Sequence, residues 1–134
     1  MYETYVKVQR IEANTMIHMA AKHFVPTAIR YTTRLGQSIG SIATACPEAD
    51  VSVQRRFLVK GSDLLKQTSQ ALEDLKALVP QMDTISGVAE MANAYHDKVV
   101  PAMAALRKPV DELEIMVDKE IWPVPPYGDL RFEV

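Results

Sequence analysis

The sequence predicts an all-α fold: an elongated antiparallel three-helix bundle followed by a non-helical C-terminal tail. Glycine is scarce, with 5 among 134 residues, and the segments between the prolines are rich in Ala, Leu, Met, Lys, Glu and Gln, which favour helices. Apolar residues recur at steps of three or four over long segments, as on one face of a helix. Short connections join these segments, and such connections make successive helices antiparallel neighbours.

The first helix is expected over about residues 3–43. Its apolar face is formed by Val6, Ala13, Ile17, Ala21, Phe24, Ala28, Tyr31, Leu35, Ile39 and Ile42. Pro26 lies inside this segment, where a proline removes one hydrogen bond and clashes with the preceding turn. The apolar phase nevertheless continues across it. We therefore expect one kinked helix, about 60 Å long at the standard rise per residue.

The second helix is expected over about residues 51–79, and Asp50 or Ser52 is placed to cap its first turn. An apolar residue recurs at every seventh position, in Val51, Leu58, Leu65, Leu72 and Val79. This spacing describes a wide apolar stripe along one side of a helix. Leu65 and Leu72 should therefore face both other helices at the centre of the bundle.

The third helix is expected over about residues 84–119, with Asp83 as its cap. Its apolar face comprises Ile85, Val88, Ala92, Tyr95, Val99, Ala102, Leu106, Val110, Leu113 and Val117. Pro101 and Pro109 lie within it. Either this is one bent helix, or Pro109 opens a fourth segment as its first residue. The bent helix is favoured, because the apolar phase is continuous.

Composition excludes several classes of protein. The formal charge is −2, and 15 Lys and Arg are scattered among 17 Asp and Glu, so nucleic-acid binding has no support. No stretch reaches the roughly 20 apolar residues of a membrane-spanning helix. The N-terminus carries no secretion signal, so the cytoplasm is the expected location. Cys46 is the only cysteine, which rules out a disulfide within the chain.

Catalytic motifs are missing, so no catalytic, cofactor-binding or metal-ligating residue is assigned. The Glu-x-x-His pairs of di-iron bundles do not occur. His18 and His23 are five residues apart, about 140° around an α-helix, and are not expected to share a metal. No glycine-rich loop between a strand and a helix offers a seat for ATP. Cys46 and His96 lack an activating partner in their sequence context.

Both ends of the sequence resemble the C-terminal domain of type III glutamine synthetases. Residues 11–20, which read IEANTMIHMA, resemble the opening helix of that domain, and the resemblance continues in Val25-Pro26-Thr27-Ala28 and Tyr31. The end of those enzymes is resembled by Asp111-Glu112-Leu113-Glu114, Val117-Asp118, Trp122-Pro123-Val124-Pro125 and Tyr127-Gly128-Asp129-Leu130-Arg131-Phe132. Residues 41–98 match only as amphipathic helix. Arg131 departs from the pattern, since an apolar residue is expected before Phe132.

The resemblance implies a parent ligase that makes glutamine from glutamate, ammonia and ATP with Mg²⁺ or Mn²⁺. That chemistry belongs to a preceding catalytic domain, and none of its ligands can be assigned to a residue of this chain. The domain would be non-catalytic, with a structural, assembly or regulatory role. Its partners would be its own catalytic domain and neighbouring subunits of a large homo-oligomer. The alternative is a free-standing helical module that offers a groove to a partner helix.

Residues 122–134 form the tail, which follows a helical bundle predicted for residues 1–121. The tail carries three aromatic residues, Trp122, Tyr127 and Phe132, within eleven positions. Disordered tails are normally poor in such residues, and the prolines at 123, 125 and 126 favour an extended segment. We therefore expect these three aromatics to anchor the tail on the bundle or on the parent enzyme.

Overall fold

The computed structural model describes residues 1–118 and 121–122, and within them it contains helices and no strand. The elements are α1 (Tyr2–Met19), η1 (Ala20–Phe24), α2 (Val25–Ala45), α3 (Ser52–Met82), α4 (Val88–Ala94), η2 (Tyr95–Val99) and α5 (Val100–Met116). η1 and η2 are short π-helical segments inside longer helices. The prediction of an all-α fold is confirmed.

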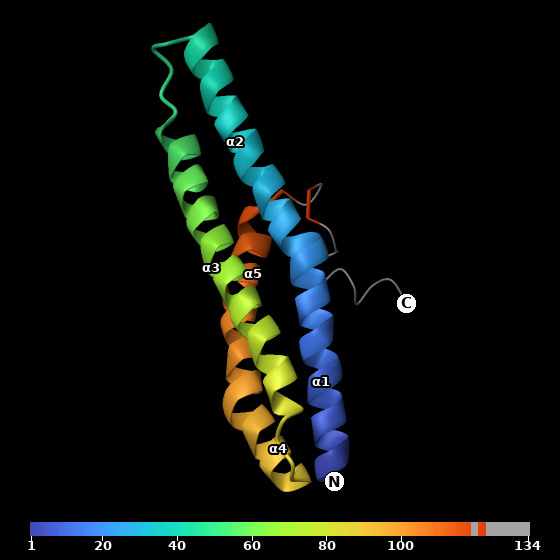
Figure 1. The fold of residues 1–134 in the computed structure, drawn as a ribbon. Coiled ribbons are helices and arrows are strands. Elements are labelled where there is room, and N and C mark those ends of the chain that lie inside the picture. The colour runs from blue at the N-terminus through green and yellow to red at the C-terminus, as the bar shows by residue number, and fades with distance from the viewer. Residues whose placement is uncertain (119–120, 123–134) are drawn as a thin grey trace.

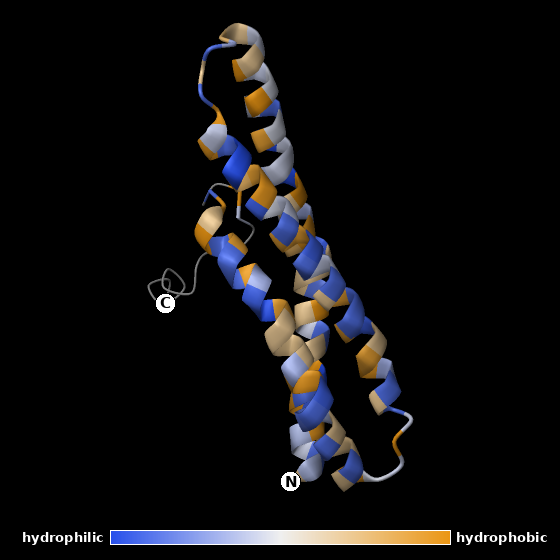
Figure 2. Cartoon of the chain, turned by 90° about the vertical axis from the view of Figure 1, so that its left-hand side faces the viewer, coloured by the Kyte–Doolittle hydropathy of each residue, from blue (hydrophilic) through white to orange (hydrophobic). Residues whose placement is uncertain are grey.

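The helices form three rods, as Figure 1 shows. The first rod is α1, η1 and α2, and α3 returns antiparallel to it. The third rod, α4, η2 and α5, packs mainly against α3. It is shorter than the other two, so the far part of α2 and the first part of α3 project beyond it as a two-helix arm (Figures 1 and 2). The predicted antiparallel three-helix bundle is therefore observed, with this extension at one end.

The prediction that Asp83 caps the third helix is wrong. That helix begins at Val88, and its N-cap is Gly87, which has an extended backbone. The Asp83 carboxylate instead accepts a hydrogen bond from the guanidinium group of Arg10, at 2.8 Å. Asp50, by contrast, accepts the backbone N–H of Ser52 at 2.9 Å, next to the start of α3, and this bond holds the pKa of Asp50 below its usual value.

Each π segment ends two residues before a proline. η1 ends at Phe24, before Pro26, and η2 ends at Val99, before Pro101. A proline cannot donate to the preceding turn, and its ring collides with the carbonyl four residues earlier. A π turn contains one more residue than an α turn and makes room for the ring. Helical structure therefore continues through both prolines, and Pro109 lies inside α5 without ending it.

Small side chains face the core along the first rod on both sides of η1. Ala13 and Ala20 are fully buried, and Thr27 continues this spacing of seven. Ala21, which an uninterrupted α-helical phase places on the apolar face, is exposed. The prediction for Ala21 is wrong because Ala20, one residue earlier and about 100° around the helix, takes the interior position.

The core lies along α3, which packs against both α2 and α5. Its fully buried large side chains are Leu75 and Met82 from α3, Tyr95 and Val99 from η2, and Leu106 and Leu113 from α5. Leu72 is buried as predicted, but Leu65 is only half-buried and the neighbouring Leu64 takes the interior position. The seven-residue repeat therefore identified the correct side of α3 but misplaced Leu65.

The contact between α2 and α3 is close at Gly61. A Cβ atom there would lie 3.3 Å from side-chain atoms of both Tyr31 and Thr32. Glycine therefore allows the two helices to approach each other at the base of the arm. Burial at this contact also raises the pKa of the Tyr31 hydroxyl.

Arg10 of α1 connects the first rod to the other two. Its Nε donates to the Tyr95 hydroxyl at 3.2 Å, and its Nη2 donates to Asp83 at 2.8 Å. The hydrogen bond with Tyr95, followed by the charge of Asp83, raises the pKa of Arg10 above its usual value. Tyr95 is fully buried, so Arg10 provides a partner for a hydroxyl group that has little access to water.

We expect Arg10→Met to lower the free energy of unfolding by ~1–3 kcal/mol, the cost of leaving a buried polar group without a partner. Asp83→Asn should lose less than ~1 kcal/mol, because an ion pair between exposed groups contributes little. Urea denaturation of both variants tests this difference. In a Tyr95→Phe background, Arg10→Met should cost clearly less. An equal cost in the two backgrounds would show that the hydroxyl does not depend on Arg10.

Candidate functional site

A cavity of about 240 Å³ lies between the end of the first helix, η1 and α5. Its lining comprises Thr15, Met16, Met19, Phe24, Leu106, Arg107, Val110, Asp111, Glu114 and Trp122. The walls are thus mainly apolar, and charged groups come from one face of α5. This arrangement is suited to holding an apolar group whose polar end reaches the side chains of α5.

Trp122 is returned to the bundle by a turn that follows α5. The helix ends where Val117 becomes extended, and the Asp118 carbonyl then accepts the backbone N–H groups of Ile121 at 3.0 Å and Trp122 at 3.1 Å. The indole ring stacks on Phe24, with ring centroids 5.5 Å apart and planes 12° from parallel. Trp122 is 8% exposed, so this residue is an integral part of the packed bundle.

Of the three predicted tail anchors, one lies within the described residues and two lie outside them. Trp122 packs on the bundle, whereas Tyr127 and Phe132 lie outside the described residues, so the anchoring role of the three together stays a prediction. Within the described part of the chain, the Trp122 indole N–H is buried and has no hydrogen-bond partner. The sequence also gave no indication that Phe24 would be the stacking partner, because a helical phase does not specify which aromatic rings meet.

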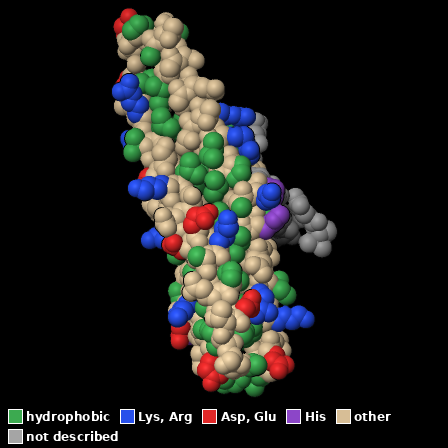
Figure 3. Space-filling model, in the orientation of Figure 1, with side chains coloured by type: hydrophobic (Ala, Val, Ile, Leu, Met, Phe, Trp, Pro, Cys, Tyr) green, Lys and Arg blue, Asp and Glu red, His purple; other side chains and the backbone are tan. Residues whose placement is uncertain are grey.

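The structure places the rings of His18 and His23 closer together than their α-helical spacing predicts, whereas the expectation that they do not share a metal is not tested. Their ring centroids lie 6.3 Å apart, with the ring planes at 78°. Histidine side chains gather in this way at one edge of the face shown in Figure 3. Among residues 1–118 and 121–122, no group of three or more His, Cys, Asp or Glu side chains is arranged to hold a metal ion.

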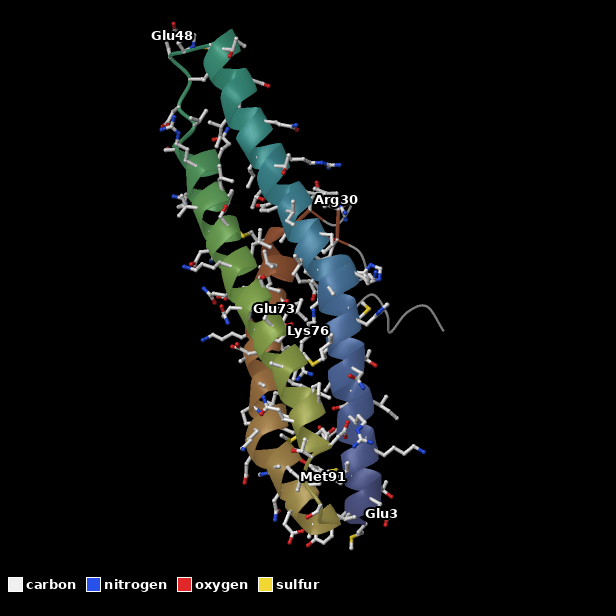
Figure 4. The ribbon with its side chains drawn as sticks, viewed as in Figure 1. Glu3, Arg30, Glu48, Glu73, Lys76 and Met91 are labelled. Carbon is white, nitrogen blue, oxygen red and sulfur yellow. The ribbon has the colours of Figure 1, made fainter. Side chains whose placement is uncertain are left out.

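Cys46 and His96 are not brought together. The Cys46 thiol lies 3.2 Å from the carboxylate of Glu48, at the tip of the arm in Figure 4. His96 belongs to η2, which directly follows α4 and Met91 at the other end of the molecule. Its Nδ1 lies 3.1 Å from a carboxylate oxygen of Asp97. The two residues therefore have separate local partners.

The base of the arm presents apolar and basic side chains together. We call the arm surface the set Val53, Arg56, Phe57 and Lys60 of α3 with Ile115 of α5. Val53, Phe57 and Ile115 are 48%, 41% and 88% exposed, and the Arg56 guanidinium carbon lies 5.9 Å from the centre of the Phe57 ring. A groove of about 390 Å³ separates Phe57 and Lys60 from the last turns of α5. Exposed apolar side chains grouped in this way are typical of contact surfaces.

Comparison with known proteins shows similarity to glutamine synthetases. A model described as "Glutamine synthetase C-terminal domain" matches residues 1–43. A glutamine synthetase of Bacteroides fragilis (strain YCH46) is 31% identical over 140 residues, which cover 97% of this chain and 18% of the relative. The chain is therefore similar to this glutamine synthetase over nearly its whole length, and to the glutamine synthetase C-terminal domain over residues 1–43.

Two further glutamine synthetases are similar over almost the whole chain. The type-3 glutamine synthetase of Dictyostelium discoideum is 25% identical over 136 residues, covering 98% of the chain and 18% of the relative. The glutamine synthetase of Butyrivibrio fibrisolvens is 25% identical over 138 residues, which cover 100% of this chain and 19% of the relative. The chain thus spans about a fifth of the length of these relatives. The resemblance at the two ends is confirmed, and it extends through the middle of the sequence.

The match to the glutamine synthetase C-terminal domain model coincides with one structural unit. Residues 1–43 include α1, η1 and nearly all of α2, so the family model covers the complete π segment and Pro26.

No helix in the described ranges is long and apolar enough to cross a membrane.

Proposed function

We propose that this chain acts as the non-catalytic C-terminal helical domain of a type III glutamine synthetase, in the cytoplasm. The whole enzyme would make glutamine from glutamate, ammonia and ATP, with Mg²⁺ or Mn²⁺ bound in its catalytic domain. The domain would hold that catalytic domain, or a neighbouring subunit of a large homo-oligomer, through its arm surface. Similarity to glutamine synthetases over nearly the whole chain supports the parent enzyme, and the relatives are about five times longer than the chain.

The arm surface is the observation that carries the proposed contact. Beyond the end of α5, the arm consists of two helices where the rest of the bundle has three (Figure 2). Complete burial of a Val, Ile or Phe side chain contributes ~1.5–3 kcal/mol, so Val53, Phe57 and Ile115 together would supply a substantial part of a contact. Arg56 and Lys60 lie beside them, and charges at the rim of a contact favour one partner and one orientation.

The experiment uses the full glutamine synthetase of Bacteroides fragilis, with this chain in place of the stretch that it matches. We expect the chimera to assemble and to make glutamine. Phe57→Asp in the chimera should shift assembly, measured by light scattering, toward smaller species, and should reduce activity. The new carboxylate, beside Val53 and Ile115, would lose its hydrating water on contact, and burial of an unpaired charge is unfavourable.

Val59→Asp is the matched control, since Val59 is 70% exposed on the same helix and lies about 200° around it from Phe57. It should leave assembly and activity unchanged. If both variants behave like the unsubstituted chimera, the arm surface makes no contact. If the chimera itself fails to assemble although the chain remains helical, the chain does not replace this domain.

The alternative function, a free-standing module that binds a partner helix, would use the same groove beside Phe57. The two functions differ in one respect: a free-standing module would bind its partner helix without a catalytic domain in the same protein. A reading frame for a catalytic domain directly upstream of residue 2 would decide in favour of the synthetase.

A further inference from the structure

His18 and His23 lie on the same side of the first rod because a π segment intervenes. His18 is in the last turn of α1, and His23 lies within η1. Five residues correspond to about 140° around an α-helix. In a π-helix the hydrogen bond joins residues five apart, as from the Val25 N–H to the Ala20 carbonyl, so residues five apart lie closer to one side of the helix than in an α-helix. The two rings accordingly meet, with their centroids 6.3 Å apart.

This separation is close to that of two imidazoles bound to one metal ion. A Zn–N bond of 2.0–2.1 Å places each ring centroid about 3.2 Å from the metal, so the two centroids of a tetrahedral pair are roughly 5 Å apart. The observed pair is about 1 Å wider. His18 is exposed and His23 is half-buried, so the His18 side chain has room to rotate toward His23.

The type of ligand selects the class of ion. Imidazole nitrogen suits Zn²⁺, Ni²⁺ and Cu²⁺, whereas Mg²⁺ and Ca²⁺ prefer oxygen. The described residues bring no third His, Cys, Asp or Glu to the pair, so water would complete the coordination. A site with two protein ligands binds more weakly than a structural zinc site with four.

We propose that His18 and His23 form a two-histidine binding site for a borderline divalent transition metal ion, created by the π segment between them. The site is separate from the Mg²⁺ or Mn²⁺ chemistry of the proposed parent enzyme and does not depend on it. A metal bound there would link α1 to η1. Because the unfolded chain does not hold the two rings together, the metal would also stabilise the folded domain.

The test is a calorimetric titration of the untagged chain with Ni²⁺ in the Cys46→Ser background, which removes the thiol as a ligand. We expect one equivalent to bind, and His18→Gln and His23→Gln each to weaken binding at least tenfold. The double substitution should be no worse than either single one, because both rings serve the same ion. His96→Gln is the matched control, since His96 is an exposed histidine paired with Asp97, and it should bind as well as the parent.

A second measurement does not depend on any substitution. In NMR spectra of the unsubstituted chain, sub-stoichiometric Cu²⁺ should broaden the imidazole signals of His18 and His23 together and spare that of His96. Loss of binding in only one of the two histidine variants would indicate a single-ligand contact and overturn the proposal. Absence of Ni²⁺ binding, or broadening of all three histidines in parallel, would overturn it as well.

Discussion

Leu75→Ala is expected to lower the free energy of unfolding by ~2–5 kcal/mol, the range for removing a large buried aliphatic side chain. Leu75 is fully buried on α3, the helix that contacts both other rods. The substitution removes apolar contacts and leaves a cavity that helices on two sides cannot both close. Urea denaturation followed by circular dichroism measures the effect, with the slope of the transition checked for two-state behaviour.

Leu65→Ala is the matched control, because it makes the same chemical change on the same helix at a half-buried position. It should cost clearly less than Leu75→Ala. A loss below ~0.5 kcal/mol for Leu75→Ala, as for a surface position, would show that α3 does not form the centre of the core. Equal losses at the two positions would place Leu65 in the interior, where its seven-residue spacing had predicted it.

Trp122→Ala is expected to lower the free energy of unfolding by about 3 kcal/mol, the lower end of the range for a buried tryptophan. The indole is 8% exposed and stacks on Phe24, but it follows the last helix, so its surroundings can partly close. Trp122 is the only tryptophan. Its fluorescence should therefore be blue-shifted and protected from acrylamide in the folded chain, and it should become accessible on unfolding.

Trp122→Phe is the control, because it retains an aromatic ring for the stack on Phe24, and it should recover more than half of the lost stability. If Trp122→Ala leaves stability unchanged and the fluorescence is that of an indole in water, Trp122 is not an anchor on the bundle. The tail would then have its contacts on the catalytic domain, and the same substitution would weaken the assembly of the full enzyme.

The sequence predicted the helical class and most of the core, because apolar spacing directly reports which side of a helix is buried. Val99, Leu106 and Val110 were placed on the apolar face of the third helix, and each is buried. The errors have physical causes. Ala21 was misplaced by one residue, because Ala20 takes the interior position. The proximity of His18 and His23 was missed because the α-helical repeat was extended through a π segment, which the residue pattern of an amphipathic helix does not reveal.

The candidate site was less predictable than the fold. The sequence indicated that Trp122 would pack, but it could not identify Phe24 as its neighbour. Asp83 was interpreted as a helix cap from its position in the sequence. In the structure its carboxylate instead accepts a hydrogen bond from Arg10, which is 73 residues away in the sequence. Contacts between helices depend on their relative rotation and displacement, which the periodicity of each helix taken alone does not contain.

The π segment η1 also fixes how α1 and α2 are rotated about their common axis. Each residue of an α-helix advances the chain by about 100°, so a helix with one residue fewer between Ala20 and Phe24 would present α1 to the bundle from a different side. The number of residues in this segment therefore determines which side of α1 faces the bundle for a given orientation of α2. A single insertion or deletion here would turn α1 by about 100° relative to α2, and so change which of its side chains face the bundle.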